Sequence, residues 1–135
     1  RLGEEARLSG TLETVNGSVY LDEGSQVVGD VENVNGEIEL VGSEVGGDLT
    51  TVSGDVFLSR GSVLRGDLII EKPRGWGRKM RNHKPRIVIG EDSQVLGAIR
   101  AEREIELFVS DTAEIGVVTG EASIEKAQRI NGDRP

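Results

Sequence analysis

The sequence predicts an all-β fold: a single-stranded parallel β-helix of about six coils, each 18–20 residues long, with one loop insertion. Three observations predict it. Apolar residues recur in register once per coil, glycines recur at two positions of the same period, and short segments alternate in the manner of strands. Because one coil is too short to bury its own apolar face, successive coils must stack to form a shared core.

Five apolar positions align across the first three coils, at steps of 19 and then 18 residues. They are Leu8, Val27 and Val45; Leu12, Val31 and Leu49; Val15, Val34 and Val52; Val19, Ile38 and Val56; and Leu21, Leu40 and Leu58. We expect each position to form one column of the core, where a buried aliphatic side chain contributes about 1.5–3 kcal/mol.

Short strands are predicted where residues alternate, namely at 19–21, 38–40, 56–58 and 87–89. Two corners are predicted where glycines repeat between these strands. The first corner carries Gly10, Gly29, Gly47, Gly66 and Gly97, and the second carries Gly17, Gly36 and Gly54. We expect glycine at these corners because it tolerates a positive φ.

The period is interrupted once. Leu49 and Val56 are 7 residues apart, whereas the matching Leu68 and Ile87 are 19 apart, so about 12 residues are inserted, in a loop at about 71–86. The β-helix is predicted to span residues 1–120, and residues 121–135, which lose the repeat, are predicted to form a C-terminal cap or a tail.

The inserted loop is the most basic part of the chain. Residues 72–86 carry a charge of +7, so the remainder of this chain of net charge −8 carries −15. The candidate partner-docking residues are Lys72, Arg74, Trp76, Arg78, Lys79, Arg81, Lys84 and Arg86. An aromatic anchor among cations fits an acidic protein or an anionic membrane surface. Alternatively, the loop is solvated and folds back on the acidic rod.

The N-terminal end is a candidate self-association surface. Residues 1–3 align with residues 20–22, so the first coil begins partway round. An incomplete coil exposes strand edges and the core residues Leu2, Leu8 and Leu12, and such edges pair readily with other chains. Either further coils precede this sequence, or this end joins a neighbour.

The repeated corner segments Val28-Gly29-Asp30-Val31, Gly47-Asp48-Leu49 and Arg65-Gly66-Asp67-Leu68 resemble those of the bactofilins, bacterial cytoskeletal proteins that form polymers. The resemblance covers most of residues 8–118. It implies a right-handed parallel β-helix that polymerises end to end without nucleotide. The Asn-Gly pairs at 16–17 and 35–36 and the basic insertion depart from that pattern and are more similar to repeat proteins of bacterial envelopes. A bacterial location, either cytoplasmic or in the periplasm and envelope, is therefore expected.

Two polar columns are interpreted as structural. Asn16 and Asn35 align at one corner, with Ser53 in the next coil, and stacked amides can hydrogen-bond along a solenoid. Asp30, Asp48 and Asp67 form a second column. Aligned carboxylates can bind Ca²⁺, but this column lacks a dense ligand set, so turn aspartates are favoured and no metal site or cofactor is expected.

The favoured function is a structural, self-associating scaffold that assembles by stacking of coil ends. The alternative is a non-polymerising envelope module that binds a ligand through the basic Trp-containing loop. An acyltransferase-like enzyme is the third class, but His83 lies in no catalytic motif and the hexapeptide pattern is incomplete, so no enzymatic activity is expected. The negative net charge argues against specific binding of nucleic acid.

Overall fold

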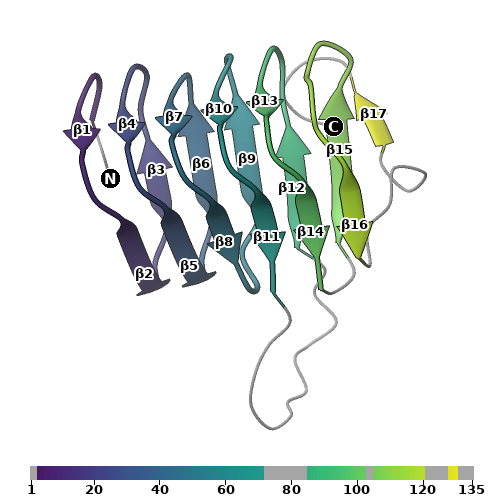
Figure 1. The fold of residues 1–135 in the computed structure, drawn as a ribbon, viewed down its shortest axis with the longest axis horizontal. Helices are drawn as coiled ribbons and strands as arrows, with labels where there is room; N and C mark the ends of the chain where they lie inside the picture. Colours follow the sequence, from purple (N-terminus) through teal and green to yellow (C-terminus); the bar gives the residue numbers. More distant parts are fainter. Residues whose placement is uncertain (1–2, 72–84, 103–104, 121–127, 131–135) are drawn as a thin grey trace, which may run out of the picture.

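The computed structural model describes residues 3–71, 85–102, 105–120 and 128–130. In these residues every regular element is a β-strand, and the strands form three parallel sheets (Figure 1). Sheet 1 contains β1 (Arg7–Leu8), β4 (Gln26–Val27), β7 (Glu44–Val45), β10 (Val63–Leu64) and β13 (Gln94–Val95). Sheet 2 contains β2 (Leu12–Asn16), β5 (Val31–Asn35), β8 (Leu49–Thr51), β11 (Leu68–Ile70), β14 (Ile99–Ala101) and β16 (Val118–Gly120). Sheet 3 contains β3 (Val19–Leu21), β6 (Ile38–Val41), β9 (Val56–Ser59), β12 (Arg86–Ile89), β15 (Glu106–Ser110) and β17 (Gln128–Ile130).

The predicted parallel β-helix is confirmed. From β1 to β15 each strand pairs with the strand three places later in the chain, so each of these coils contributes one strand to each sheet. In the last coil β16 pairs with β14 and β17 pairs with β15. Sheet 1 has five strands and the described chain makes about five turns, slightly fewer than the six predicted. In Figure 1 the chain descends along the nearer strands β1 and β2, ascends along the more distant β3 and advances towards the yellow end, which is the right-handed sense.

Strand register confirms four of the five predicted core columns. Leu8 pairs with Val27, Leu12 with Val31, Val19 with Ile38 and Leu21 with Leu40, and the same columns continue into later coils. The interior is therefore a set of aliphatic ladders. Their members are almost completely buried from the second coil to Val109, whereas Val118 in the last coil is only partly buried.

The fifth predicted column is wrong. Val15 and Val34 do not enter the core, and their side chains are 62% and 39% exposed. Leu12 faces inward, so the period-two alternation of a strand directs Thr14 inward as well and Val15 outward. In the next coils the inward place is taken by Asn33 and Thr51, which are both buried although they are polar.

The reason for glycine at the first corner also differs from the prediction. Of the eight glycines predicted at the two corners, only Gly36 has a positive φ. A Cβ on Gly29 would lie 2.7 Å from the carbonyl oxygen of Gly10, and Gly66 would meet the backbone of Gly47. Glycine is therefore required there because the backbones of consecutive coils approach closely.

Positive φ values occur instead at a third corner, between sheets 3 and 1. Gly24, Gly42 and Gly61 occupy it in three coils, and Asp92 adopts the same left-handed conformation in a later coil at φ 58°. A serine follows each of these four residues and is buried. The sequence reasoning did not identify this corner.

The strand register places the insertion between β11 and β12. β11 pairs with β8, and β12 pairs with β9, so the register continues unchanged across the inserted residues. Arg86 belongs to β12, so the loop ends before it. In the C-terminal segment predicted as a cap or tail, β17 continues sheet 3 by pairing with β15.

Candidate functional site

The N-terminal end of the solenoid, formed by β1, β2 and β3, is the predicted self-association surface. Each of these strands is the terminal strand of its sheet in the described residues (Figure 1). Leu8 and Leu12 are only partly buried, whereas Val27 and Val31, their neighbours in the second coil, are 1% and 0% exposed. Leu2 lies outside the described residues. The end therefore presents partly covered core side chains beside strand edges.

Two glycines at this end have open space where their counterparts are crowded. A Cβ on Gly10 would have no atom within 4 Å, and on Gly17 it would meet only Thr14 Oγ1, at 3.4 Å. In the second coil, a Cβ on Gly29 would collide with the carbonyl of Gly10, and a Cβ on Gly36 would collide with the carbonyl of Gly17. The missing contacts at Gly10 and Gly17 are those that another coil stacked on this end would supply.

The aspartate column joins consecutive coils at the first corner. Asp30 Oδ1 accepts a 2.8 Å hydrogen bond from the backbone N–H of Asp48, and Asp48 Oδ1 accepts one of 2.8 Å from Asp67. Asp67 Oδ1 then accepts from the N–H of Ala98 at 2.9 Å. In the first coil Thr11 takes the place of aspartate, and its Oγ1 accepts from the N–H of Asp30 at 3.4 Å. The carboxylates therefore act as acceptors for backbone donors.

The asparagine column behaves as predicted. Asn35 Nδ2 donates to Asn16 Oδ1 at 3.0 Å, and the Ser53 hydroxyl donates to Asn35 Oδ1. These exposed side chains thus link three consecutive coils at the second corner.

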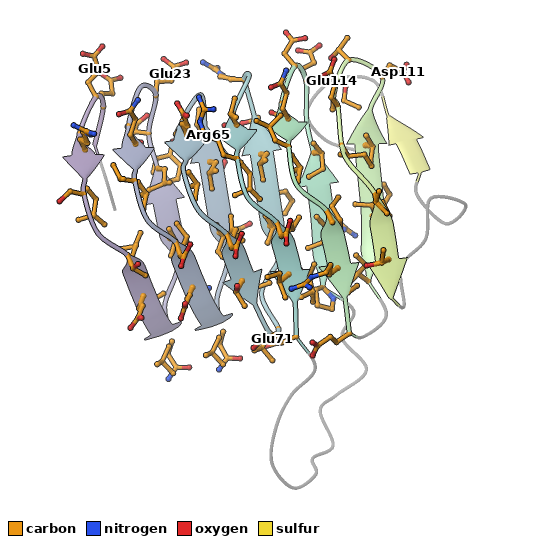
Figure 2. All side chains as sticks on the ribbon, in the orientation of Figure 1. Glu5, Glu23, Arg65, Glu71, Asp111 and Glu114 are labelled. Atoms are coloured by element: carbon orange, nitrogen blue, oxygen red, sulfur yellow. The ribbon has the colours of Figure 1, made fainter. Side chains whose placement is uncertain are left out.

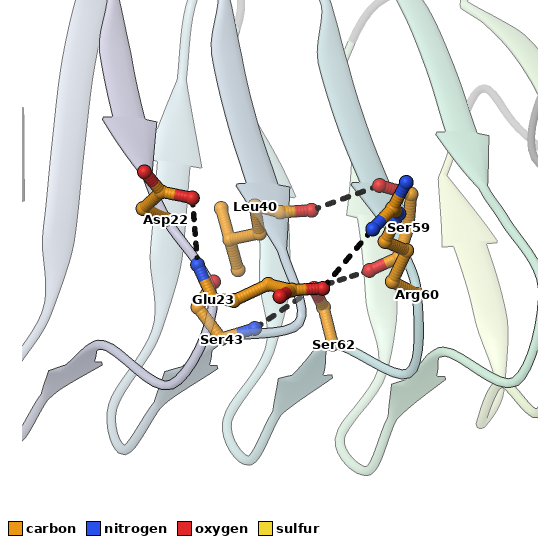
Figure 3. A network of polar contacts seen from close by, with 7 residues as sticks. All are labelled: Asp22, Glu23, Leu40, Ser43, Ser59, Arg60 and Ser62. Carbon is orange, nitrogen blue, oxygen red and sulfur yellow. Dashed lines mark hydrogen bonds and ion pairs between the residues drawn. The ribbon is translucent and has the colours of Figure 1, made fainter. Parts of the chain in front are cut away.

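A polar network joins the coils at the third corner (Figure 3). The Ser62 hydroxyl donates to the carbonyl of Ser59 at 2.8 Å and accepts from the N–H of Ser43 at 3.2 Å. At the same corner, Arg60 forms a 3.1 Å ion pair with Glu23, which lies two coils earlier. Both of these charged side chains are more than half exposed, so the pair contributes little to stability.

Of the eight candidate docking residues, only Arg86 belongs to the described part of the chain. Lys72, Arg74, Trp76, Arg78, Lys79, Arg81 and Lys84 lie outside the described residues, as does His83. Arg86 is exposed at the start of β12, where its Nε lies 3.5 Å from Glu106 Oε1 and its guanidinium lies 5.7 Å from the centre of the Phe108 ring. Arg86 is therefore engaged with its own sheet.

A shallow groove of about 380 Å³ crosses the outer face of sheet 2, and the sequence reasoning did not identify it. Val15, Val34 and Val52 form an apolar row along it. Glu13, Glu32 and Glu71 also line the groove, and none of the described residues that line it is basic. Figure 2 shows Glu71 at the lower end of sheet 2. The available signal was the Glu-x-Val spacing of residues 13–15 and 32–34. We call this surface the valine groove.

The described residues contain no cluster of histidine and acidic side chains suited to holding a metal ion. In the same part of the chain, no helix is long and apolar enough to cross a bilayer.

Comparison with known proteins adds no relationship to these observations. No family model matches the chain, and no curated protein and no solved structure matches it significantly. The parallel β-helix fold is therefore shown by the structure alone.

Proposed function

We propose that this protein is a structural, self-associating scaffold of the bactofilin-like type, which assembles by stacking of coil ends without nucleotide. The proposal assigns it no catalytic role. Its bacterial location, in the cytoplasm or in the envelope, is part of the same proposal.

The observation that carries the proposal is the N-terminal end. Within the solenoid, each coil covers the next through parallel strand pairing, a buried aliphatic layer and close contact between corner glycines. Among the described residues of the N-terminal end, β1, β2 and β3 have one strand partner each, Leu8 and Leu12 are partly buried, and a Cβ on Gly10 would have open space beside it. A second copy stacked there would provide the same three interactions that join neighbouring coils.

The test compares assembly of the wild-type chain with that of the double variant Gly10→Ala/Gly17→Ala. The added methyl groups would project towards the position of a preceding coil, as they would at Gly29 and Gly36, and would prevent close stacking. We expect light scattering and negative-stain microscopy to show concentration-dependent assemblies of the wild type and a much smaller species for the variant. Circular dichroism should show the same fold in both.

Ser18→Ala provides the control, because Ser18 is exposed next to Gly17 and its substitution removes an atom instead of adding one. This variant should assemble like the wild type. A wild-type chain that stays monomeric over a wide range of concentration and salt would reject the proposal and favour the alternative of a non-polymerising binding module.

A further inference from the structure

We propose that Asn35 is a site of spontaneous deamidation, and that the fold protects Asn16, its counterpart in the first coil, from the same reaction. Deamidation converts a side-chain amide to a carboxylate with water as the only co-reactant. The inference does not rest on self-assembly, because it concerns the second corner within one copy of the chain.

The two asparagines form a matched pair. Each occurs in the tripeptide Val-Asn-Gly, at residues 15–17 and 34–36, and each is exposed to solvent. Glycine after asparagine favours deamidation, because without a Cβ its backbone nitrogen can approach the amide carbon of the preceding side chain. In an unfolded chain the two sites should therefore react at similar rates. A difference between them in the native protein must come from the fold.

The glycine nitrogens that would attack differ in their hydrogen bonds. The N–H of Gly17 donates to the carbonyl oxygen of Asn35 at 3.1 Å. In the third coil, the N–H of Gly54 donates to Thr51 Oγ1 at 3.3 Å. Within the described part of the chain, the N–H of Gly36 donates to no acceptor. Its nitrogen can lose its proton without first breaking a hydrogen bond to the protein, so it is the most available nucleophile of the three.

The amide carbonyls do not account for the difference. Asn16 Oδ1 accepts a hydrogen bond from Asn35 Nδ2 at 3.0 Å, and Asn35 Oδ1 accepts one from the Ser53 hydroxyl. Each donor stabilises the negative charge that develops on the oxygen when the amide carbon is attacked. Since both carbonyls are polarised in this way, the hydrogen bonding of the glycine nitrogen decides which amide reacts.

The reaction consumes one water molecule and releases one ammonia molecule. The nitrogen of Gly36 forms a bond to Cγ of Asn35, its proton passes through solvent to Nδ2, and the Cγ–Nδ2 bond breaks to release ammonia. Water then opens the resulting succinimide ring at either of its carbonyl carbons. One product is aspartate, and the other is isoaspartate, in which the main chain passes through Cγ and is longer by one carbon.

The isoaspartate product should not fit this corner. Gly36 is packed between the backbones of two other glycines: a Cβ on Gly36 would collide with the carbonyl of Gly17, and a Cβ on Gly54 would collide with the carbonyl of Gly36. A main chain that is one carbon longer at residue 35 cannot keep both of these close approaches. Deamidation would therefore loosen the contact between the first and second coils.

Peptide mapping by mass spectrometry of the purified chain, held at mildly alkaline pH, measures the reaction at each site. Cleavage after glutamate places the two asparagines on different peptides, because Glu23 and Glu32 lie between them. We expect Asn35 to deamidate about 2–12 times faster than Asn16 in the native chain, which is the factor that one protein hydrogen bond supplies. In denaturing urea the two rates should become equal.

Two substitutions of Asn33 test the cause. Asn33 is buried at the position that Thr51 occupies in the third coil. Asn33→Thr supplies an acceptor for the N–H of Gly36, as Thr51 does in its own coil, and should slow the deamidation of Asn35 to the protected rate. Asn33→Val has the same shape without the hydroxyl and should leave the reaction fast. Both variants lose the hydrogen bond from Asn33 Nδ2 to the carbonyl of Gly36, so this loss cancels in the comparison.

Equal rates at Asn16 and Asn35 in the native chain, or a faster reaction at Asn16, would overturn the proposal. A native Asn35 that stays intact while the urea-unfolded chain deamidates would also overturn it. Equal slowing by Asn33→Thr and Asn33→Val would do the same, because the added hydroxyl would then have no part in protection. Circular dichroism checks that both variants keep the fold, and the comparison of native and unfolded wild type needs neither of them.

Discussion

Asp48 Oδ1 accepts a 2.8 Å hydrogen bond from the backbone N–H of Asp67, its counterpart one coil later. The two carboxylates carry like charges in neighbouring coils, yet each is oriented towards a backbone donor. A carboxylate that accepts from an amide forms one of the stronger classes of hydrogen bond. The column thus connects coils at a corner that lies between two sheets.

Removing one carboxylate of this column should destabilise the solenoid. We expect Asp48→Ala to lower the free energy of unfolding by about 1.5–3 kcal/mol, because the N–H of Asp67 loses its acceptor. Asp48→Asn keeps an acceptor and should cost less. Urea titration followed by circular dichroism would measure both, with Glu37→Ala as a control that removes an exposed carboxylate at another corner. Equal losses for Asp48→Ala and Glu37→Ala would contradict the assigned role.

A methyl group at the first corner should be costly only where a coil precedes it. In Gly66→Ala the new Cβ meets both the backbone of Gly47 and the Asp48 carboxylate, so we expect a loss of about 1–3 kcal/mol or more. Gly10→Ala has open space and should stay within about 0.5 kcal/mol of the wild type. Thermal and urea unfolding at concentrations below assembly would measure the difference. Comparable effects at both positions would show that close approach is not the reason for glycine.

At Gly61 and Asp92 in the third corner, a substitution should change the free energy of unfolding only through the φ angle that the residue must adopt. A Cβ on Gly61 has no atom nearer than 3.9 Å, but its φ of 78° is unfavourable for residues with a side chain. Gly61→Ala should therefore destabilise by about 1 kcal/mol. Asp92→Gly, at the same corner, should have the opposite sign and gain up to about 0.5–1 kcal/mol, reduced by the greater freedom of glycine in the unfolded chain. Unfolding midpoints that move in the same direction for both variants would argue against a conformational cause.

Substitutions in the core and in the valine groove should differ in their effect on the free energy of unfolding, although both positions recur once per coil. Leu49 is fully buried, so Leu49→Ala should cost about 2–5 kcal/mol. Val15 is mostly exposed, so Val15→Ala should change the free energy of unfolding by no more than about 0.5 kcal/mol. Denaturant unfolding of the two variants compares them directly. A large loss of unfolding free energy in Val15→Ala would contradict the exposed position of Val15 and would indicate that its side chain packs in the core.

The sequence by itself determined the repeat, the four aliphatic columns and the site of the insertion. The period alone determines which residues stack, since a residue that recurs once per coil must lie on its counterpart. The column of Leu12, Val31 and Leu49 was predictable because strand alternation and burial agree there. The asparagine pair Asn16 and Asn35 was predictable for a different reason, because stacking alone brings their amides together.

Only the tertiary structure decided whether a side chain near a corner faces the core or solvent, and why glycine is required at the first corner. Val15 shares its spacing with Leu12, but it lies three residues further along the strand, on the opposite face, and so faces outward. The glycines of the first corner are explained by the distance between neighbouring backbones, which no single coil contains. The valine groove likewise exists only because stacking aligns Glu13 with Glu32 and Val15 with Val34. Period specifies which residues are neighbours, whereas the path of the backbone specifies whether those neighbours meet in the core or in solvent.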